Sequence, residues 1–120
     1  IGLGAGVFCY AAIQLTKRLG VDDALAVFGV HGIGGTWGAL ATGVFATVAV
    51  NAAAKDGLLA GNPEQLGIQA IAVVATITYS AVMTFVILKV INLFVGLRVP
   101  EQDEVLGLDA TQHREAAYQL

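Results

Sequence analysis

Long apolar stretches alternate with short polar segments along this chain. The run from Ala24 to Val50 contains no Asp, Glu, Lys or Arg over 27 residues, and the run from Leu66 to Leu88 contains none over 23. About 20 apolar residues of α-helix cross a hydrocarbon core about 30 Å thick, so both runs are long enough to span a membrane. The opening stretch, 1–16, is also uncharged. The pattern predicts membrane-spanning helices.

This pattern predicts an all-α fold, a polytopic membrane helix bundle. The first run starts in mid-span without a basic leader or an initiator Met. We therefore expect the chain to be a piece of a larger protein with further helices upstream. The expected elements are helices over about 1–16, 23–47 and 65–97, loops over 17–22 and about 48–64, a transmembrane part over 1–97 and a polar tail over 98–120.

Polar residues mark the boundaries of these helices. Asp22 and Asp23 directly precede the second apolar run, where a carboxylate satisfies free backbone amides at a helix start. Asp56 with Gly57, and Gly61 with Asn62 and Pro63, are typical of turns, so the second loop is expected to be well defined.

Composition supports a membrane location. The chain is 57% hydrophobic and 12% charged, with a mean hydropathy of +0.76, whereas soluble domains carry about 25% charged residues. The net charge of −3 excludes the basic surface typical of nucleic-acid binding, so no nucleic-acid partner is expected. The single cysteine, Cys9, has no partner in the chain.

The distribution of basic residues predicts an orientation. Lys17 and Arg18 follow the first apolar run, Arg98 follows the third, and Lys55 is alone in the second loop. Because cytoplasmic loops carry an excess of Lys and Arg, we expect the first loop and the C-terminus to be cytoplasmic.

The middle of the second run is rich in glycine. Six glycines lie between positions 29 and 43, and in an exposed soluble helix each would cost about 1 kcal/mol. In a membrane, small residues four apart let helix backbones approach closely. The spacing is met by Gly34 with Gly38, and by Gly35 with Ala39 and Gly43. We expect a tightly packed interior helix.

His31 lies within the same glycine-rich stretch, FGVHGIGGTWG. If the helix starts at Asp23, His31 is eight residues inside it, or about 12 Å from that end. Ionisable residues inside a membrane are functional candidates, and neutral imidazole can accept one proton and donate another. The structural alternative is a histidine hydrogen-bonded between helices for packing.

Several motifs together resemble the ammonium transporter (Amt/Rh) family. The first, DDALAVFGVHGIGGTWGALATGVFA, matches the tenth-helix signature of that family. The resemblance continues in order and spacing through nearly the whole chain. The matching segments are Asp22–Ala46, QLGIQ over Gln65–Gln69, GLRV over Gly96–Val99, GLD over Gly107–Asp109, His113 and EAAY over Glu115–Tyr118.

The resemblance implies an ammonium or ammonia transporter rather than an enzyme, with no cofactor and no metal. The family forms homotrimers of eleven-helix protomers, each with its own hydrophobic pore. The chain would hold the partial ninth, the tenth and the eleventh helix of one protomer, followed by a cytoplasmic tail. His31 would match the second of two pore histidines, and Val27, one turn earlier, would line the pore beside it.

For the tail, the resemblance implies packing on the cytoplasmic face, coupling of neighbouring protomers and contact with a PII-type signal protein. The positions implied for this contact are Arg98, Gly107, Asp109 and Tyr118. The chain departs from the family pattern at two positions. Ala26 stands where many members carry Asp, and Arg114 stands where a Gly usually follows the tail histidine.

Three alternatives remain open at this point. A Rh-type gas channel or an ammonium sensor belongs to the same superfamily. A membrane redox subunit would use His31 as a haem ligand, but it needs a second axial histidine and His113 lies in the tail. A structural packing subunit is the third alternative.

Overall fold

The structure, a computed structural model, describes residues 1–115. All regular secondary structure in that range is helical and no strand occurs within it, which confirms the all-α prediction. The chain divides into two compact units, Ile1–Thr78 and Tyr79 onward, and the division falls inside the long helix α3 (Pro63–Phe94). Each unit is described separately.

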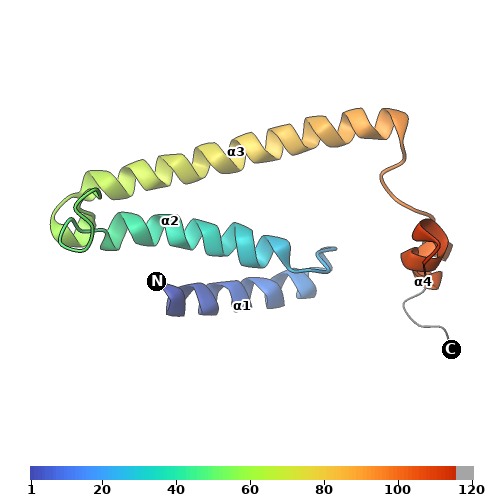
Figure 1. Cartoon of the computed structure of the whole chain (residues 1–120), viewed down its shortest axis with the longest axis horizontal. Helices are drawn as coiled ribbons and strands as arrows, with labels where there is room; N and C mark the ends of the chain where they lie inside the picture. Colours follow the sequence, from blue (N-terminus) through green and yellow to red (C-terminus); the bar gives the residue numbers. More distant parts are fainter. Residues whose placement is uncertain (116–120) are drawn as a thin grey trace. The chain divides into compact units, whose positions relative to one another are not determined.

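The first unit contains two antiparallel helical segments that lie side by side (Figure 1). One is α1 (Gly2–Arg18), and the other begins as a π-helix, η1 (Phe28–Ile33), and continues as α2 (Gly34–Phe45). A short 3₁₀ turn, η2 (Leu58–Ala60), packs on α2 and precedes the first half of α3.

The helix boundaries differ from the predicted ones, most of all at the start of the second helix. The predicted helix over 23–47 begins only at Phe28 and ends at Phe45. The reason is a left-handed backbone at Ala26, with φ of 53°, which a continuous right-handed helix cannot contain. The first helix extends to Arg18, so Lys17 and Arg18 lie in its last turn, where basic side chains stabilise the negative end of the helix dipole.

Of the helices described, α3 is long and apolar enough to cross a membrane, with 32 residues and a mean hydropathy of 2.2 in its best window. It covers Pro63–Phe94 rather than the predicted 65–97. By itself, α1 has 17 residues and α2 has 12, although η1 and α2 follow one another without a gap.

Close packing of the first unit depends on glycines. A Cβ on Gly29 would lie 2.9 Å from Ile13 Cγ1, and one on Gly34 would lie 2.8 Å from Cys9 Sγ, so both face α1. A Cβ on Gly43 would lie 2.8 Å from Leu66 Cα at the start of α3. The prediction of close helix approach is therefore confirmed at Gly34 and Gly43. At Gly35 and Gly38 a Cβ would meet nothing within 4 Å in this chain, so close approach there stays a prediction.

Trp37 holds the N-terminal end of α1 against α2. Its indole Nε1 donates a hydrogen bond to the carbonyl of Ile1 at 2.9 Å. Its ring packs against Phe8 with 4.8 Å between ring centroids, and it also covers Gly4. Trp37 therefore packs between α1 and α2.

The loop between α2 and α3 is well defined, as its turn residues predict. Asp56 Oδ1 accepts a hydrogen bond from Val48 N at 2.9 Å, and Asn62 Nδ2 donates to the carbonyl of Asp56 at 2.9 Å. Gly57 N donates to the carbonyl of Ala46, and a Cβ on Gly57 would lie 2.6 Å from the carbonyl oxygen of Gly43. Only glycine, which has no side chain, fits at position 57.

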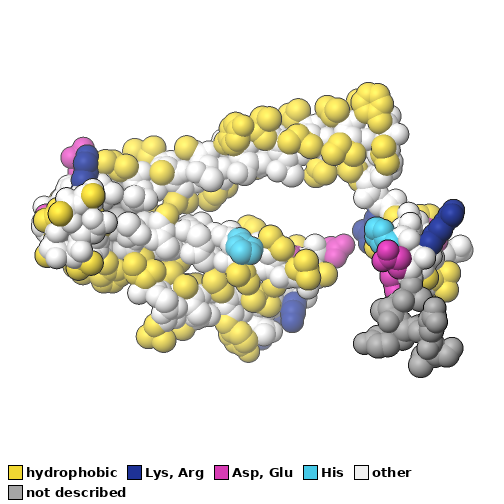
Figure 2. Space-filling model, viewed as in Figure 1, with side chains coloured by type: hydrophobic (Ala, Val, Ile, Leu, Met, Phe, Trp, Pro, Cys, Tyr) yellow, Lys and Arg dark blue, Asp and Glu magenta, His cyan; other side chains and the backbone are white. Residues whose placement is uncertain are grey.

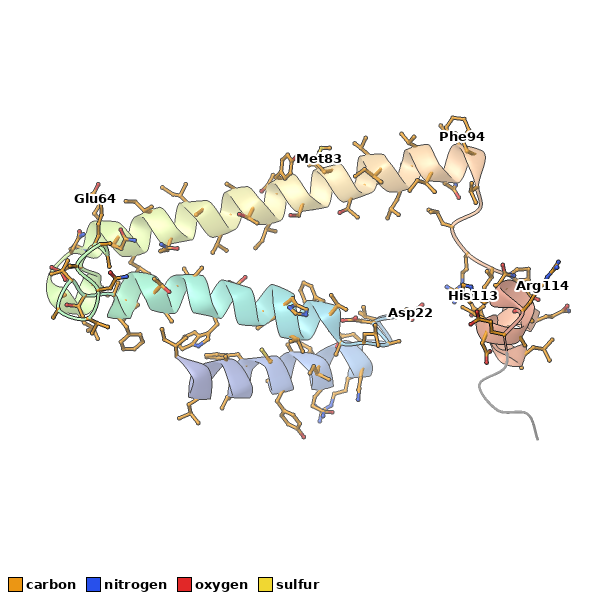
Figure 3. The ribbon with its side chains drawn as sticks, viewed as in Figure 1. Asp22, Glu64, Met83, Phe94, His113 and Arg114 are labelled. Carbon is orange, nitrogen blue, oxygen red and sulfur yellow. The ribbon has the colours of Figure 1, made fainter. Side chains whose placement is uncertain are left out.

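Apolar side chains remain exposed over most of the described chain, and Ala41 is the one fully buried hydrophobic residue in it. Figure 2 shows that charged side chains gather at one end of the α1–α2 pair and at the loop before α3, with apolar side chains between them. Asp22 and Glu64 mark opposite ends of this unit in Figure 3. A polar–apolar–polar arrangement of this kind fits a bilayer, where lipid or neighbouring helices cover the apolar surface.

The second unit contains the remainder of α3, with Met83 and Phe94 along it (Figure 3), and a folded tail. The tail forms α4 (Glu101–Leu106) and a short π-turn, η3 (Asp109–His113). These two elements pack against each other, so the described part of the tail has a local structure of its own.

Candidate functional site

His31 lies in η1, and its side chain is exposed in this chain. Val27 is the N-cap residue of η1 and is 51% exposed. Both predicted pore residues are therefore accessible, and they lie four residues apart at the start of one helical segment.

The predicted depth of His31 inside its helix is wrong. The prediction places His31 eight residues inside a helix that starts at Asp23. In the structure, η1 begins at Phe28, only three residues before His31. The intervening residues, Ala24 to Ala26, form a turn that ends in the left-handed Ala26.

Asp23 nevertheless caps this helix start. Its Oδ1 accepts a hydrogen bond from Val27 N at 2.8 Å, and its Oδ2 accepts one from Phe28 N at 2.9 Å. Two free amides are thus satisfied by one carboxylate, placed near the positive end of the helix dipole. Of the two aspartates predicted as caps, Asp23 makes these bonds.

A π-helix around His31 was not predicted. Hydrophobic periodicity distinguishes helix from strand but does not distinguish α from π geometry in a six-residue segment. Such turns are uncommon and occur often at functional sites. The nearest signal in the sequence is the run of glycines around His31, because glycine tolerates irregular backbone geometry.

The imidazole of His31 makes no hydrogen bond with the residues that the structure describes. A packing role based on a hydrogen bond to α1 or α3 therefore finds no support within residues 1–115. The neighbouring residues in η1 carry no charge. Gly29, two residues earlier, packs on Ile13, and the ring of Phe28 covers Gly32, since a Cβ there would lie 3.1 Å from Phe28 Cδ2. Sequence reasoning did not identify Phe28 as a neighbour of this site.

In the tail, three of the four predicted contact residues bond to nearby tail residues. Arg98 Nε and Nη2 donate to the two carboxylate oxygens of Glu104 at 3.1 and 3.3 Å. The carbonyl of Gly107, a residue with φ of 99°, accepts a bond from Thr111 Oγ1 at 2.9 Å, and Asp109 begins η3. The fourth, Tyr118, lies outside the described residues.

The two departures from the family pattern share a backbone feature. Ala26 and Arg114 are the two non-glycine residues with positive φ in the described chain, at 53° and 56°. Asp and Gly adopt this left-handed conformation more readily than Ala and Arg do. At both positions the chain therefore carries a residue that is less suited to its own backbone.

Comparison with known proteins assigns the family. The model of the Ammonium Transporter Family matches residues 1–118. The chain is 49% identical over 120 residues to an ammonium transporter of Bacillus subtilis, covering 99% of this chain and 30% of that protein. It is 45% identical over 118 residues to ammonium transporter Amt1 of Archaeoglobus fulgidus, covering 98% of this chain and 30% of that protein.

A third relative is an ammonium transporter of Aquifex aeolicus, 51% identical over 121 residues, covering 100% of this chain and 28% of that protein. The chain therefore spans about 30% of the length of the curated relatives that it matches. The family model covers nearly every residue, and these relatives come from widely different organisms. The chain belongs to the ammonium transporter family.

Proposed function

We propose that this chain forms part of the ammonium or ammonia pathway of a membrane transporter, and that it is not an enzyme. The single observation that carries the proposal is an exposed His31 in an otherwise apolar, uncharged helical segment of a chain from the ammonium transporter family. The printed names of the relatives point to the same substrate.

In this proposal, His31 and Val27 line a hydrophobic pore. A bare ammonium ion is costly to transfer into a narrow apolar channel, because nothing replaces its hydration shell. Loss of a proton at the pore entrance lets neutral ammonia pass. A neutral imidazole then offers one acceptor and one donor nitrogen to a small polar molecule along an apolar wall.

The parent protein, in this proposal, is a homotrimer in the cell membrane with its C-terminus in the cytoplasm. The orientation follows from the positions of Lys17, Arg18 and Arg98 relative to Lys55. The tail is proposed to contact a PII-type signal protein. The helical elements α4 and η3, in the described part of the tail, offer a defined surface for such a contact.

The test is ammonium-evoked current in liposomes containing the full-length parent, as wild type, His31→Ala and His113→Ala. His113→Ala is the matched control, because it removes the same side chain from the tail. We expect a current in wild type and in the control, and its loss or altered ion selectivity in His31→Ala. An unchanged current in His31→Ala would contradict the role of His31 and leave only the transport proposal.

The alternatives have distinct signatures in the same preparation. A Rh-type gas channel would give ammonia uptake, followed as a pH change inside the liposomes, without current. An ammonium sensor would bind ammonium without either signal. A redox subunit with His31 as a haem ligand would show a Soret band in the purified parent.

A further inference from the structure

Ala26 adopts a backbone conformation that its side chain disfavours. Its φ of 53° lies in the left-handed region, where Cβ comes too close to the following carbonyl oxygen. The residue is half-buried and directly precedes Val27 and the π-helix that contains His31. A strained residue persists only where surrounding interactions hold it.

Hydrogen bonds hold Ala26 from both sides. Its N–H donates to the carbonyl of Asp23 at 3.0 Å, and its carbonyl accepts a bond from Val30 N at 2.9 Å. The next two amides are held by the Asp23 carboxylate at 2.8 and 2.9 Å. The backbone on both sides of the strained residue is thus fixed.

The same residues have a regular alternative. If Ala26 were right-handed, the helix would continue back to Asp23, as the apolar pattern alone predicts. The amides of Val27 and Phe28 would then bond to the backbone carbonyls of Asp23 and Ala24, four residues earlier. The observed cap at Asp23 and a continuous helix are therefore mutually exclusive.

If the alternative helix is α-helical throughout, it also replaces the π geometry of Phe28–Ile33 and changes the direction of His31. Gly29 is fixed against Ile13 of α1, because no side chain fits between them. His31, two residues later, points away from α1 by an angle that depends on the number of residues per turn. A π-helix has more residues per turn than an α-helix, so replacing one by the other rotates His31 relative to the fixed Gly29 contact.

We propose that Ala26 is a positioning residue for His31: its left-handed backbone, held by the Asp23 cap, maintains the π-turn that directs the imidazole away from α1. This inference rests on the proposed pore role of His31. It assigns Ala26 no contact with the substrate.

The test uses the full-length parent with three substitutions. Ala26→Ile opposes a left-handed backbone, because β-branched residues strongly disfavour it. Ala26→Gly permits that backbone without a Cβ. Ala24→Ile is the matched control, since Ala24 is exposed, precedes η1 and has an ordinary negative φ. The readouts are ammonium-evoked current and the rate of His31 modification by diethylpyrocarbonate, measured by peptide mass spectrometry with His113 as internal reference.

We expect Ala26→Ile to change the His31 modification rate by about fivefold or more and to lower the current, since the left-handed penalty grows for a branched side chain. Ala26→Gly and Ala24→Ile should behave like wild type. Unchanged His31 reactivity and current in Ala26→Ile would overturn the proposal.

If Ala26→Ile does not fold, Asp23→Asn weakens the same cap and must change His31 reactivity in its place. Absence of current in wild type contradicts the proposed transport, while the reactivity of His31 still decides the role of Ala26.

Discussion

Residues 1–115 contain two π-turns, each with one histidine, and the two turns are held in different ways. η1 carries His31 and follows the left-handed Ala26, whereas η3 carries His113 and ends at the left-handed Arg114. η1 packs by glycine against α1 and leads directly into α2. η3 is held by polar bonds, from Thr111 Oγ1 to the Gly107 carbonyl and from Gln112 Nε2 to Asp103 Oδ2 at 2.9 Å.

The difference indicates how much each histidine depends on tertiary packing. The backbone of η1 is fixed against a second helix through steric contacts that tolerate no added atom. The backbone of η3 depends on one part-buried and one exposed side-chain hydrogen bond, and water can replace the exposed bond at little cost. Substitutions near His31 should therefore affect the whole unit, and substitutions near His113 should affect only the tail.

The largest effect, a loss of folding stability, is expected for Gly29→Ala. The added Cβ would lie 2.9 Å from Ile13 Cγ1 and 3.3 Å from Ile13 N, so α1 and η1 must move apart. Overpacking of this kind costs about 1–3 kcal/mol. Thermal unfolding of the full-length parent in detergent measures the loss. Gly35→Ala is the matched control, because a Cβ there meets nothing within 4 Å in this chain. Equal stability of the two variants would contradict the packing described.

A smaller loss of folding stability is expected for Asp23→Ala. This substitution removes the carboxylate that accepts hydrogen bonds from the amides of Val27 and Phe28. Loss of an N-terminal cap costs about 0.5–2 kcal/mol, and two bonds to one carboxylate favour the upper part of that range. Asp22→Ala, an exposed neighbour, is the control and should unfold at the wild-type temperature. A comparable loss in Asp22→Ala would show that nearby negative charge, rather than the cap, is responsible.

In the tail, Arg114→Gly should stabilise η3. Glycine adopts the left-handed backbone that Arg114 holds at φ of 56°, which relieves a penalty of about 1 kcal/mol. Hydrogen exchange of the peptide covering 109–115 should slow by about fivefold, the equivalent of that energy. Arg114→Lys keeps both the charge and the Cβ, so its exchange should match wild type. Faster exchange in Arg114→Gly would contradict this account.

The smallest effect is expected for Glu104→Gln. Its bidentate pair with Arg98 is exposed, at 73% for the Arg98 side chain and 36% for that of Glu104, and such pairs contribute about 0.2–1 kcal/mol. Amide exchange in α4 should become slightly faster at low salt, and the difference from wild type should shrink at high salt. Glu101→Gln serves as the control. A salt-independent difference would indicate that hydrogen-bond geometry, not charge, holds the pair.

The sequence predicts the helical class and the approximate position of each helix well, because long uncharged runs have one stable arrangement in a membrane, where the backbone satisfies its own hydrogen bonds. It also identifies Asp23 as a cap and His31 as the ionisable residue inside an apolar segment. It does not predict that the helix begins at Phe28, since the residues from Ala24 to Ala26 satisfy the apolar pattern in either conformation.

By itself, therefore, the sequence determined the fold class and the family of this protein, and it marked the candidate residues. Tertiary structure decided three finer features: the left-handed Ala26, the π-turn around His31, and the choice of Gly29, Gly34 and Gly43 as contact glycines. The physical reason is that the sequence pattern does not show which contacts form: the contact glycines pack on distant residues, whereas the left-handed Ala26 is held by hydrogen bonds to Asp23 and Val30 in its own segment. Packing on Ile13, Cys9 and Leu66 selects among local conformations that differ in energy by only a few kcal/mol.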